Sequence, residues 1–204
     1  MYRSTTAGIF SFVVLIFAAP VAAQGVRAHL GIGGSLTFPT SFYHADPSGD
    51  GFTPALYGLM VVDLKLPNSP IGFRLDASTG HNPANDSLKA HLSAAVNMPA
   101  DAKTSLVGVN ASVTYTLQPA SIGRGYLMAG LGLHHVTLTE TANGVSVDTS
   151  ATKFAWNVGV GLTVGTGVVS GFIEARYVDV SAFEGLKPTY FATTTGIRLR
   201  IGGS

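Results

Sequence analysis

The amino-acid sequence predicts an all-β protein, an eight-stranded antiparallel up-and-down transmembrane β-barrel. Eight segments alternate apolar residues with small polar ones, the pattern of strands that have two different faces. The segments between them are alternately short and long, as the turns and loops of membrane barrels are. Only 11% of residues are charged, against about 25% in soluble domains.

The chain begins with the features of a secretory signal peptide. A single cation, Arg3, precedes an apolar run from Ile9 to Ala23. This run is shorter than the roughly 20 residues that a membrane helix needs. We therefore expect residues 1–23 to be a signal peptide and residues 24–204 to form one barrel domain.

The first predicted strand, residues 25–38, shows the alternation plainly. Ile32 and Leu36 belong to one face, whereas Ser35 and Thr37 belong to the other. The same alternation recurs in seven further segments: 55–66, 71–79, 104–117, 125–138, 152–165, 171–180 and 190–201. Most of these segments reach or approach the roughly 9–11 residues that a tilted strand needs to cross a bilayer.

The connections predict which ends of the strands lie together. Short connections are expected at 67–70, 118–124 and 165–167, and longer ones at 39–53, 80–103, 139–151 and 181–189. In membrane barrels, the short turns face the periplasm and the long loops face outward. Within the second long connection, Leu88 and Leu92 have helical spacing after Asn85 or Asp86, either of which can cap a short helix.

The polar face of these strands predicts a narrow lumen. Its residues are mostly Gly, Ser, Thr, Asn and Ala, whereas the water-exposed face of a soluble sheet would be rich in Lys and Glu. An eight-stranded barrel leaves room for little except side chains. A soluble β-sandwich or a lipocalin-like barrel remains the alternative, because it would show the same alternation.

Most charged residues within the predicted strands belong to this polar face. A charge facing lipid at mid-membrane costs about 2–4 kcal/mol, so we expect these residues to point into the lumen. The predicted lumen ion cluster, which has a structural role, comprises Arg27, Arg74, Asp76, Glu174, Arg176, Arg198 and Arg200. Within it, Glu174 is expected near Arg198, with Arg27 approaching from the first strand. The alternative is that these residues form surface salt bridges of a soluble sheet.

Aromatic residues near the strand ends predict two membrane-interface girdles. One would contain Phe38, Phe154, Trp156, Tyr190 and Phe191, and the other Tyr115, Tyr126 and Phe172. Tyr57, in contrast, is expected inside the barrel, where it would help to plug the lumen.

Four segments carry a resemblance to a known family. They are GYLMAGLGL, KFAWNVGVGLTVG, GFIEARYVDV and TTGIRLR, and the resemblance extends loosely over residues 25–201. With them, the chain resembles the outer-membrane beta-barrel domain family of small opacity-type and OmpA-like eight-stranded barrels. This resemblance implies an integral protein of a Gram-negative-type outer membrane, with a role between envelope integrity and adhesion.

The sequence offers little for catalysis, cofactors or metals, and we predict none of the three. His134 and His135 are adjacent on a strand and point to opposite faces, so they cannot chelate one ion. A lipid-active barrel enzyme would need a nucleophile, a His and an acid close together. The nearest candidates are His135, Thr137 and Glu140, with Thr in place of Ser.

The predicted function is therefore that of a sealed barrel with surface-exposed loops, in a structural or surface-interaction role. The alternatives are a narrow channel for small solutes and, third, a lipid-active enzyme. We expect a monomer surrounded by outer-membrane lipid and lipopolysaccharide, and assembled by the outer-membrane assembly machinery. An extracellular partner would contact the loops. The near-neutral charge argues against nucleic acid as a partner.

Overall fold

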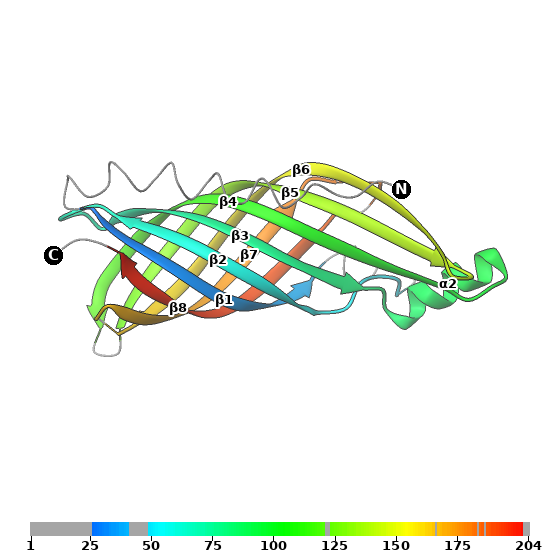
Figure 1. The fold of residues 1–204 in the computed structure, drawn as a ribbon, viewed down its shortest axis with the longest axis horizontal. Coiled ribbons are helices and arrows are strands. Elements are labelled where there is room, and N and C mark those ends of the chain that lie inside the picture. Colours follow the sequence, from blue (N-terminus) through cyan, green and yellow to red (C-terminus); the bar gives the residue numbers. More distant parts are fainter. Residues whose placement is uncertain are drawn as a thin grey trace.

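The structure is a computed structural model that describes residues 26–40, 49–120, 123–165, 167–182, 184–185 and 187–201. The predicted signal peptide lies outside these residues. The strands are β1 (Arg27–Pro39), β2 (Ala55–Lys65), β3 (Ile71–Pro83), β4 (Ala100–Ala120), β5 (Gly123–Ala142), β6 (Val145–Val164), β7 (Val169–Val180) and β8 (Thr189–Ile201). Each pairs antiparallel with the next, and β8 pairs with β1, so the sheet closes into a tilted barrel (Figure 1). The predicted eight-stranded up-and-down barrel is confirmed.

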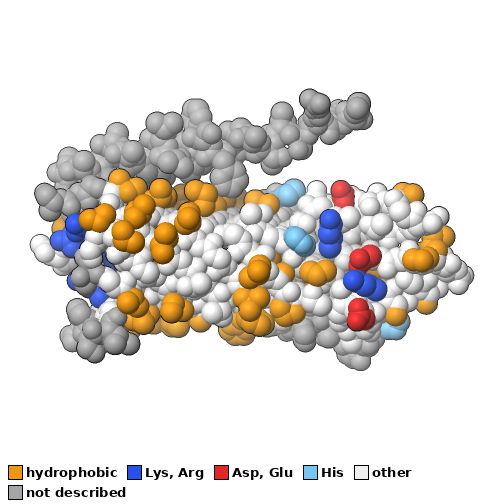
Figure 2. Space-filling view, turned by 60° about the horizontal axis from the view of Figure 1, so that its bottom comes forward, with side chains coloured by type: hydrophobic (Ala, Val, Ile, Leu, Met, Phe, Trp, Pro, Cys, Tyr) orange, Lys and Arg blue, Asp and Glu red, His pale blue; other side chains and the backbone are white. Residues whose placement is uncertain are grey.

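The barrel has an apolar outer surface. Leucine, isoleucine and valine side chains point outward from the strands, among them Ile32, Leu56, Leu133 and Ile173, which are 57%, 76%, 59% and 53% exposed. Figure 2 shows apolar side chains spread along the barrel wall. So large an apolar surface is unstable in water and suits contact with lipid.

The two ends of the barrel differ. At the end that we call the turn end, short connections join β2 to β3, β4 to β5 and β6 to β7. At the opposite end, the loop end, helix α2 (Asp86–Val96) lies between β3 and β4. The predicted helix is confirmed with Asn85 as its cap, since the Asn85 side chain accepts a hydrogen bond from the Leu88 amide at 2.9 Å. No helix among the described residues is long and apolar enough to cross a membrane.

The expected long loop over residues 139–151 is wrong. Strands β5 and β6 continue through this segment and meet at a two-residue turn, Asn143–Gly144. Both turn residues have positive φ, 48° and 76°, as tight hairpin turns of the Asn-Gly kind require. The Asn-Gly pair, flanked by alternating residues, was the sequence signal for this turn.

Because these strands are so long, part of the sheet extends past the barrel at the loop end (Figure 1). Strand β6 pairs with β7 only from Ala155 onward, and β3 pairs with β4 only as far as Lys103. We call the mutually paired residues 100–103, 139–142 and 145–148 the protruding sheet. In the described part of the chain, β6 residues 145–153 pair with β5 alone.

The prediction of two aromatic girdles is wrong for three residues. Tyr126, Phe172 and Tyr190 are 6%, 1% and 4% exposed and point into the lumen. Their positions in the strand alternation already placed them on the polar face. Outward-facing aromatics remain at both ends: Tyr115 near the turn end, and Phe38, Phe154, Trp156 and Phe191 near the loop end.

Candidate functional site

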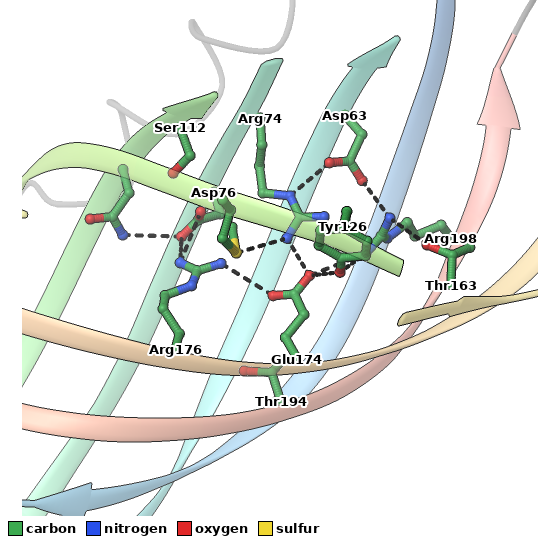
Figure 3. Close-up of polar contacts among 12 residues, drawn as sticks. Asp63, Arg74, Asp76, Ser112, Tyr126, Thr163, Glu174, Arg176, Thr194 and Arg198 are labelled. Carbon is green, nitrogen blue, oxygen red and sulfur yellow. Dashed lines mark hydrogen bonds and ion pairs between the residues drawn. The ribbon is translucent and has the colours of Figure 1, made fainter. Parts of the chain in front are cut away.

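The interior of the barrel holds a network of charged side chains. Strand alternation turns Asp63 of β2, Arg74 and Asp76 of β3, and Arg198 of β8 into the lumen, where all are buried. Strand β7 adds Glu174 and Arg176, which are also buried. We call these six residues the lumen network (Figure 3).

Glu174 lies at the centre of the lumen network. Its carboxylate forms ion pairs with Arg176 at 3.2 Å, with Arg198 at 3.1 Å, and with Arg74. Strands β3 and β7 are four strands apart in either direction around the eight-stranded barrel, so the Arg74–Glu174 pair crosses the lumen. A carboxylate so deeply buried needs such partners, because removing it from water is costly.

Two aspartates balance the remaining positive charge. Asp63 Oδ1 accepts a hydrogen bond from Arg74 Nε at 2.6 Å, and Asp63 Oδ2 lies 3.2 Å from Arg198 Nη1. Asp76 accepts two hydrogen bonds from Arg176 Nη1, at 2.9 and 3.0 Å, across the lumen from β7 to β3. The network thus pairs three carboxylates with three guanidinium groups and has no net charge.

Tyr126 of β5 is a neutral partner of the lumen network, a role that the predicted membrane-interface girdle did not include. Its hydroxyl donates a hydrogen bond to Glu174 and accepts one from Arg198 Nη2 at 2.7 Å. The guanidinium carbons of Arg74 and Arg198 each lie 5.3 Å from the centre of the Tyr126 ring. These cation–π contacts add to the attraction that holds both cations in the lumen.

The structure brings together five of the seven residues of the predicted ion cluster, namely Arg74, Asp76, Glu174, Arg176 and Arg198. Arg27 and Arg200 lie elsewhere. They line a cavity of about 80 Å³ at the turn end. Arg27 is exposed because β1 and β2 end at the Arg27–Lys65 pair, at the rim of the barrel.

The lumen network is continued toward the loop end by neutral polar groups. Asn110 donates a hydrogen bond to Asp76 at 3.0 Å, and a ring nitrogen of His134 lies 3.1 Å from the Asn110 side-chain oxygen. Farther along, the Tyr57 hydroxyl donates to Asn82 at 2.6 Å. These bonds satisfy buried polar groups that would otherwise destabilise the barrel.

An apolar cluster follows at the loop end. It contains the buried residues Phe52, Leu106, Val136 and Val180, and helix α2 packs Leu88 and Leu92 against it. Between the turn-end mouth and this cluster, two cavities of about 10 and 20 Å³ border the lumen network. A single water molecule needs roughly 10–15 Å³, so these cavities hold little more than isolated waters.

The protruding sheet forms a second candidate site with helix α2. A hollow of about 310 Å³ lies between them and is lined mainly by apolar side chains. Leu92 and Val96 of the helix form one side, and Val145 and Val147 of β6 form part of the other. The two β6 valines are 68% and 60% exposed, so the hollow is open to solvent.

The residues considered for catalysis do not form a site in the described structure. His135 points outward, where Nδ1 lies 3.2 Å from the Thr152 hydroxyl on the neighbouring strand. Alternation puts Glu140 on the opposite face of β5 from His135 and Thr137. Within the described ranges, no three His, Asp or Glu side chains are grouped so that they could hold a metal ion.

Solved structures with the same fold include bacterial outer-membrane and surface proteins. The attachment invasion locus protein Ail of Yersinia pestis has a TM-score of 0.57 and 15% identity, over 86% of this chain and 99% of Ail. Neisserial surface protein A has a TM-score of 0.58 and 15% identity, over 87% of this chain and 98% of its own. A major outer membrane protein of Thermus thermophilus has a TM-score of 0.55 and 12% identity, over 85% of this chain and 99% of its own.

Sequence comparison gives the family directly. No protein with a curated description matches the chain significantly. The profile of the outer membrane protein beta-barrel domain, however, matches residues 9–198. With the closed eight-stranded barrel and its apolar outer wall, this match shows that the chain belongs to the outer membrane protein beta-barrel domain family.

Proposed function

We propose that this protein is a sealed, non-enzymatic barrel of the outer membrane that presents the protruding sheet and helix α2 at the cell surface as an interaction site. The observation that carries this proposal is the open apolar hollow between the two, with its exposed valines, Val145 and Val147. A barrel that only strengthened the envelope would not need exposed apolar side chains beyond the lipid. Such patches are typical of sites that bind a partner.

The filled lumen supports the sealed part of the proposal. Two ion pairs, Arg74–Glu174 and Arg176–Asp76, cross the barrel from β3 to β7. The apolar cluster around Phe52 and Leu106 closes the loop end above them. A solute would have to displace both layers, which disfavours the narrow-channel alternative.

The length of the hairpin supports display at the surface. Strand β6 has 20 residues, about twice the length that crosses a bilayer, so its loop-end half extends beyond the membrane. Ail, named for attachment and invasion, shares the fold, but at 15% identity this likeness concerns the fold alone. The proposed role therefore depends on the hollow and not on Ail.

The test removes the apolar hollow and leaves the barrel intact. Cells that produce the wild-type protein, Val145→Ser/Val147→Ser, or no protein are compared for attachment to matrix-coated polystyrene. Ser146→Ala/Ser150→Ala is the matched control, because both serines are exposed on β6, alternate in face with Val145 and Val147, and do not line the hollow. Equal surface amounts are verified by protease shaving of intact cells, which also tests the orientation.

We expect the wild-type protein and the control to promote attachment, and the valine variant to lose most of the effect. A second variant lacks residues 139–142 and 145–148 and retains Asn143–Gly144, which preserves the register because Leu138 already pairs with Thr149. It should behave like the valine variant. Equal attachment with and without the wild-type protein would rule out the proposed role.

A further inference from the structure

We propose that the turn-end mouth of the barrel is a binding site for a small phosphate-class anion. Four cations and one histidine converge there from four strands, and we call them the basic mouth: Arg27, His29, Lys65, Arg124 and Arg200. Figure 2 shows Lys and Arg side chains gathered at the turn end, on the left of the view. The proposal is independent of the interaction site at the loop end.

The basic mouth is concave and lacks an acidic residue among the described residues that line it. Its cavity has a volume of about 80 Å³, and neither Asp nor Glu lines it. That volume is several times the roughly 10–15 Å³ that one water molecule needs. Charges of one sign around such a recess focus their field into it and raise the local concentration of anions.

Strand pairing brings positive charges close together in the basic mouth. The register places His29 between Asp63 of β2 and Arg200 of β8, and it places Arg27 directly opposite Lys65. Like charges directly opposite each other on neighbouring strands destabilise a sheet. The acid of the lumen network nearest in sequence to Lys65, Asp63, is already paired with Arg74 and Arg198. A bound anion would relieve the repulsion between these cations.

The donors of the basic mouth suit an anion with several oxygens. Arg27, Arg124 and Arg200 present planar guanidinium forks, which bind phosphate oxygens in pairs. The hydroxyls of Thr163 and Ser170 line the same cavity and can donate to further oxygens. A carboxylate, with two oxygens, would use fewer of these donors. The phosphate could be free in solution or belong to an anionic lipid headgroup, whose phosphodiester offers two charged oxygens and two ester oxygens.

The basic mouth also borders the lumen network. Lys65, Arg124 and Thr163 line both the mouth and the cavity of about 10 Å³ that reaches Tyr126 and Arg198. An anion in the mouth would therefore lie near the end of the network that Asp63 occupies. Binding should thus affect the stability of the whole barrel, because a ligand that binds only the folded state stabilises it.

The first experiment measures phosphate binding by the refolded protein in dodecyl maltoside. Inorganic phosphate is titrated by calorimetry, with sodium chloride adjusted to constant ionic strength so that general screening is the same throughout. We expect saturable binding to the wild-type protein. The Arg27→Gln/Arg200→Gln variant should bind about tenfold more weakly, or worse, since it loses charge-assisted contacts. Lys89→Gln/Lys103→Gln, which removes two cations at the loop end, should bind like the wild type.

The second experiment uses a variant that we expect to be more stable than the wild type. Lys65→Glu places a carboxylate opposite Arg27, where it should act as a built-in counter-ion. We expect this variant to unfold at higher urea than the wild type in chloride, and to gain nothing further from phosphate. The wild type should gain stability from phosphate and approach the variant.

Nanodiscs distinguish the two sources of phosphate. If an anionic lipid supplies the ligand, phosphatidylglycerol should stabilise the wild type relative to phosphatidylcholine, whose phosphate charge is balanced by its own choline. Phosphatidylglycerol should also suppress the response of the wild type to free phosphate. It should not stabilise Lys65→Glu. If the ligand is free, the response to inorganic phosphate should be equal in both lipids. The proposal is wrong if neither free phosphate nor phosphatidylglycerol separates the wild type from Arg27→Gln/Arg200→Gln at matched ionic strength.

Discussion

Arg74 and Glu174 form an ion pair across the full width of the barrel, from β3 to β7, although 100 residues separate them in the chain. Only closure of the sheet brings them together, because β3 and β7 do not pair with each other. The pair therefore links the folding of the two halves of the barrel. Its consequences can be measured.

Replacing Glu174 should destabilise the protein more than replacing any one of its partners. Glu174→Gln leaves three guanidinium groups with two carboxylates in a buried site, at a cost of about 3–5 kcal/mol. Arg198→Gln should cost less, because Glu174 keeps Arg74 and Arg176. Urea unfolding in detergent of both single variants and the double variant gives the coupling between Glu174 and Arg198, which should be about 1–3 kcal/mol. A coupling of zero would contradict the 3.1 Å ion pair.

Tyr126→Phe should destabilise the barrel because it removes one hydroxyl group from the lumen. The hydroxyl donates to Glu174 and accepts from Arg198, so its removal leaves two buried charged groups with one partner fewer each. The expected loss is about 1–3 kcal/mol in the free energy of unfolding. The ring and its cation contacts stay in place. Tyr115→Phe is the control, because Tyr115 is 50% exposed on the outer wall and should show little change.

Gly161→Ala should impair folding because the lumen has no space for a methyl group there. A Cβ atom on Gly161 would lie 2.3 Å from Cζ of Tyr126. Since Tyr126 is fixed by its hydrogen bonds, we expect a loss of about 1–3 kcal/mol. Gly58→Ala is the matched control, with no atom within 4 Å of the new Cβ. The folded fraction is measured as the heat-modifiable band on a gel, and equal fractions for the two variants would be inconsistent with the packing described.

The wild-type protein should form no stable pore in planar bilayers. The lumen network and the apolar cluster around Phe52 fill the interior, and the cavities beside the network measure only about 10 and 20 Å³. The measurement is single-channel recording of the purified protein, against detergent from a mock purification. Reproducible ohmic steps that appear only with the protein would favour the narrow-channel alternative.

Much of the fold is readable from the sequence because strand alternation is local. A period of two assigns each side chain to one face, so Glu174, Arg176 and Arg198 could be placed in the lumen without a structure. The helix cap at Asn85 is equally local. The same rule places Tyr126 in the lumen, whereas its position near a strand end is equally typical of a membrane interface. The girdle prediction therefore missed the part that Tyr126 has in the network.

The sequence by itself therefore determined the number of strands, their two faces and the sign of each buried charge. Only the tertiary structure decided which charges meet. Barrel closure and strand register set the distances between the charged side chains. Both depend on backbone pairing between segments far apart in the chain. Glu174, for example, lies opposite Thr194 in the register and reaches Arg198 and Arg74 through its side chain. Arg27 and Arg200 share the inward face with Glu174, but they lie near the turn-end termini of their strands and therefore at the mouth of the barrel.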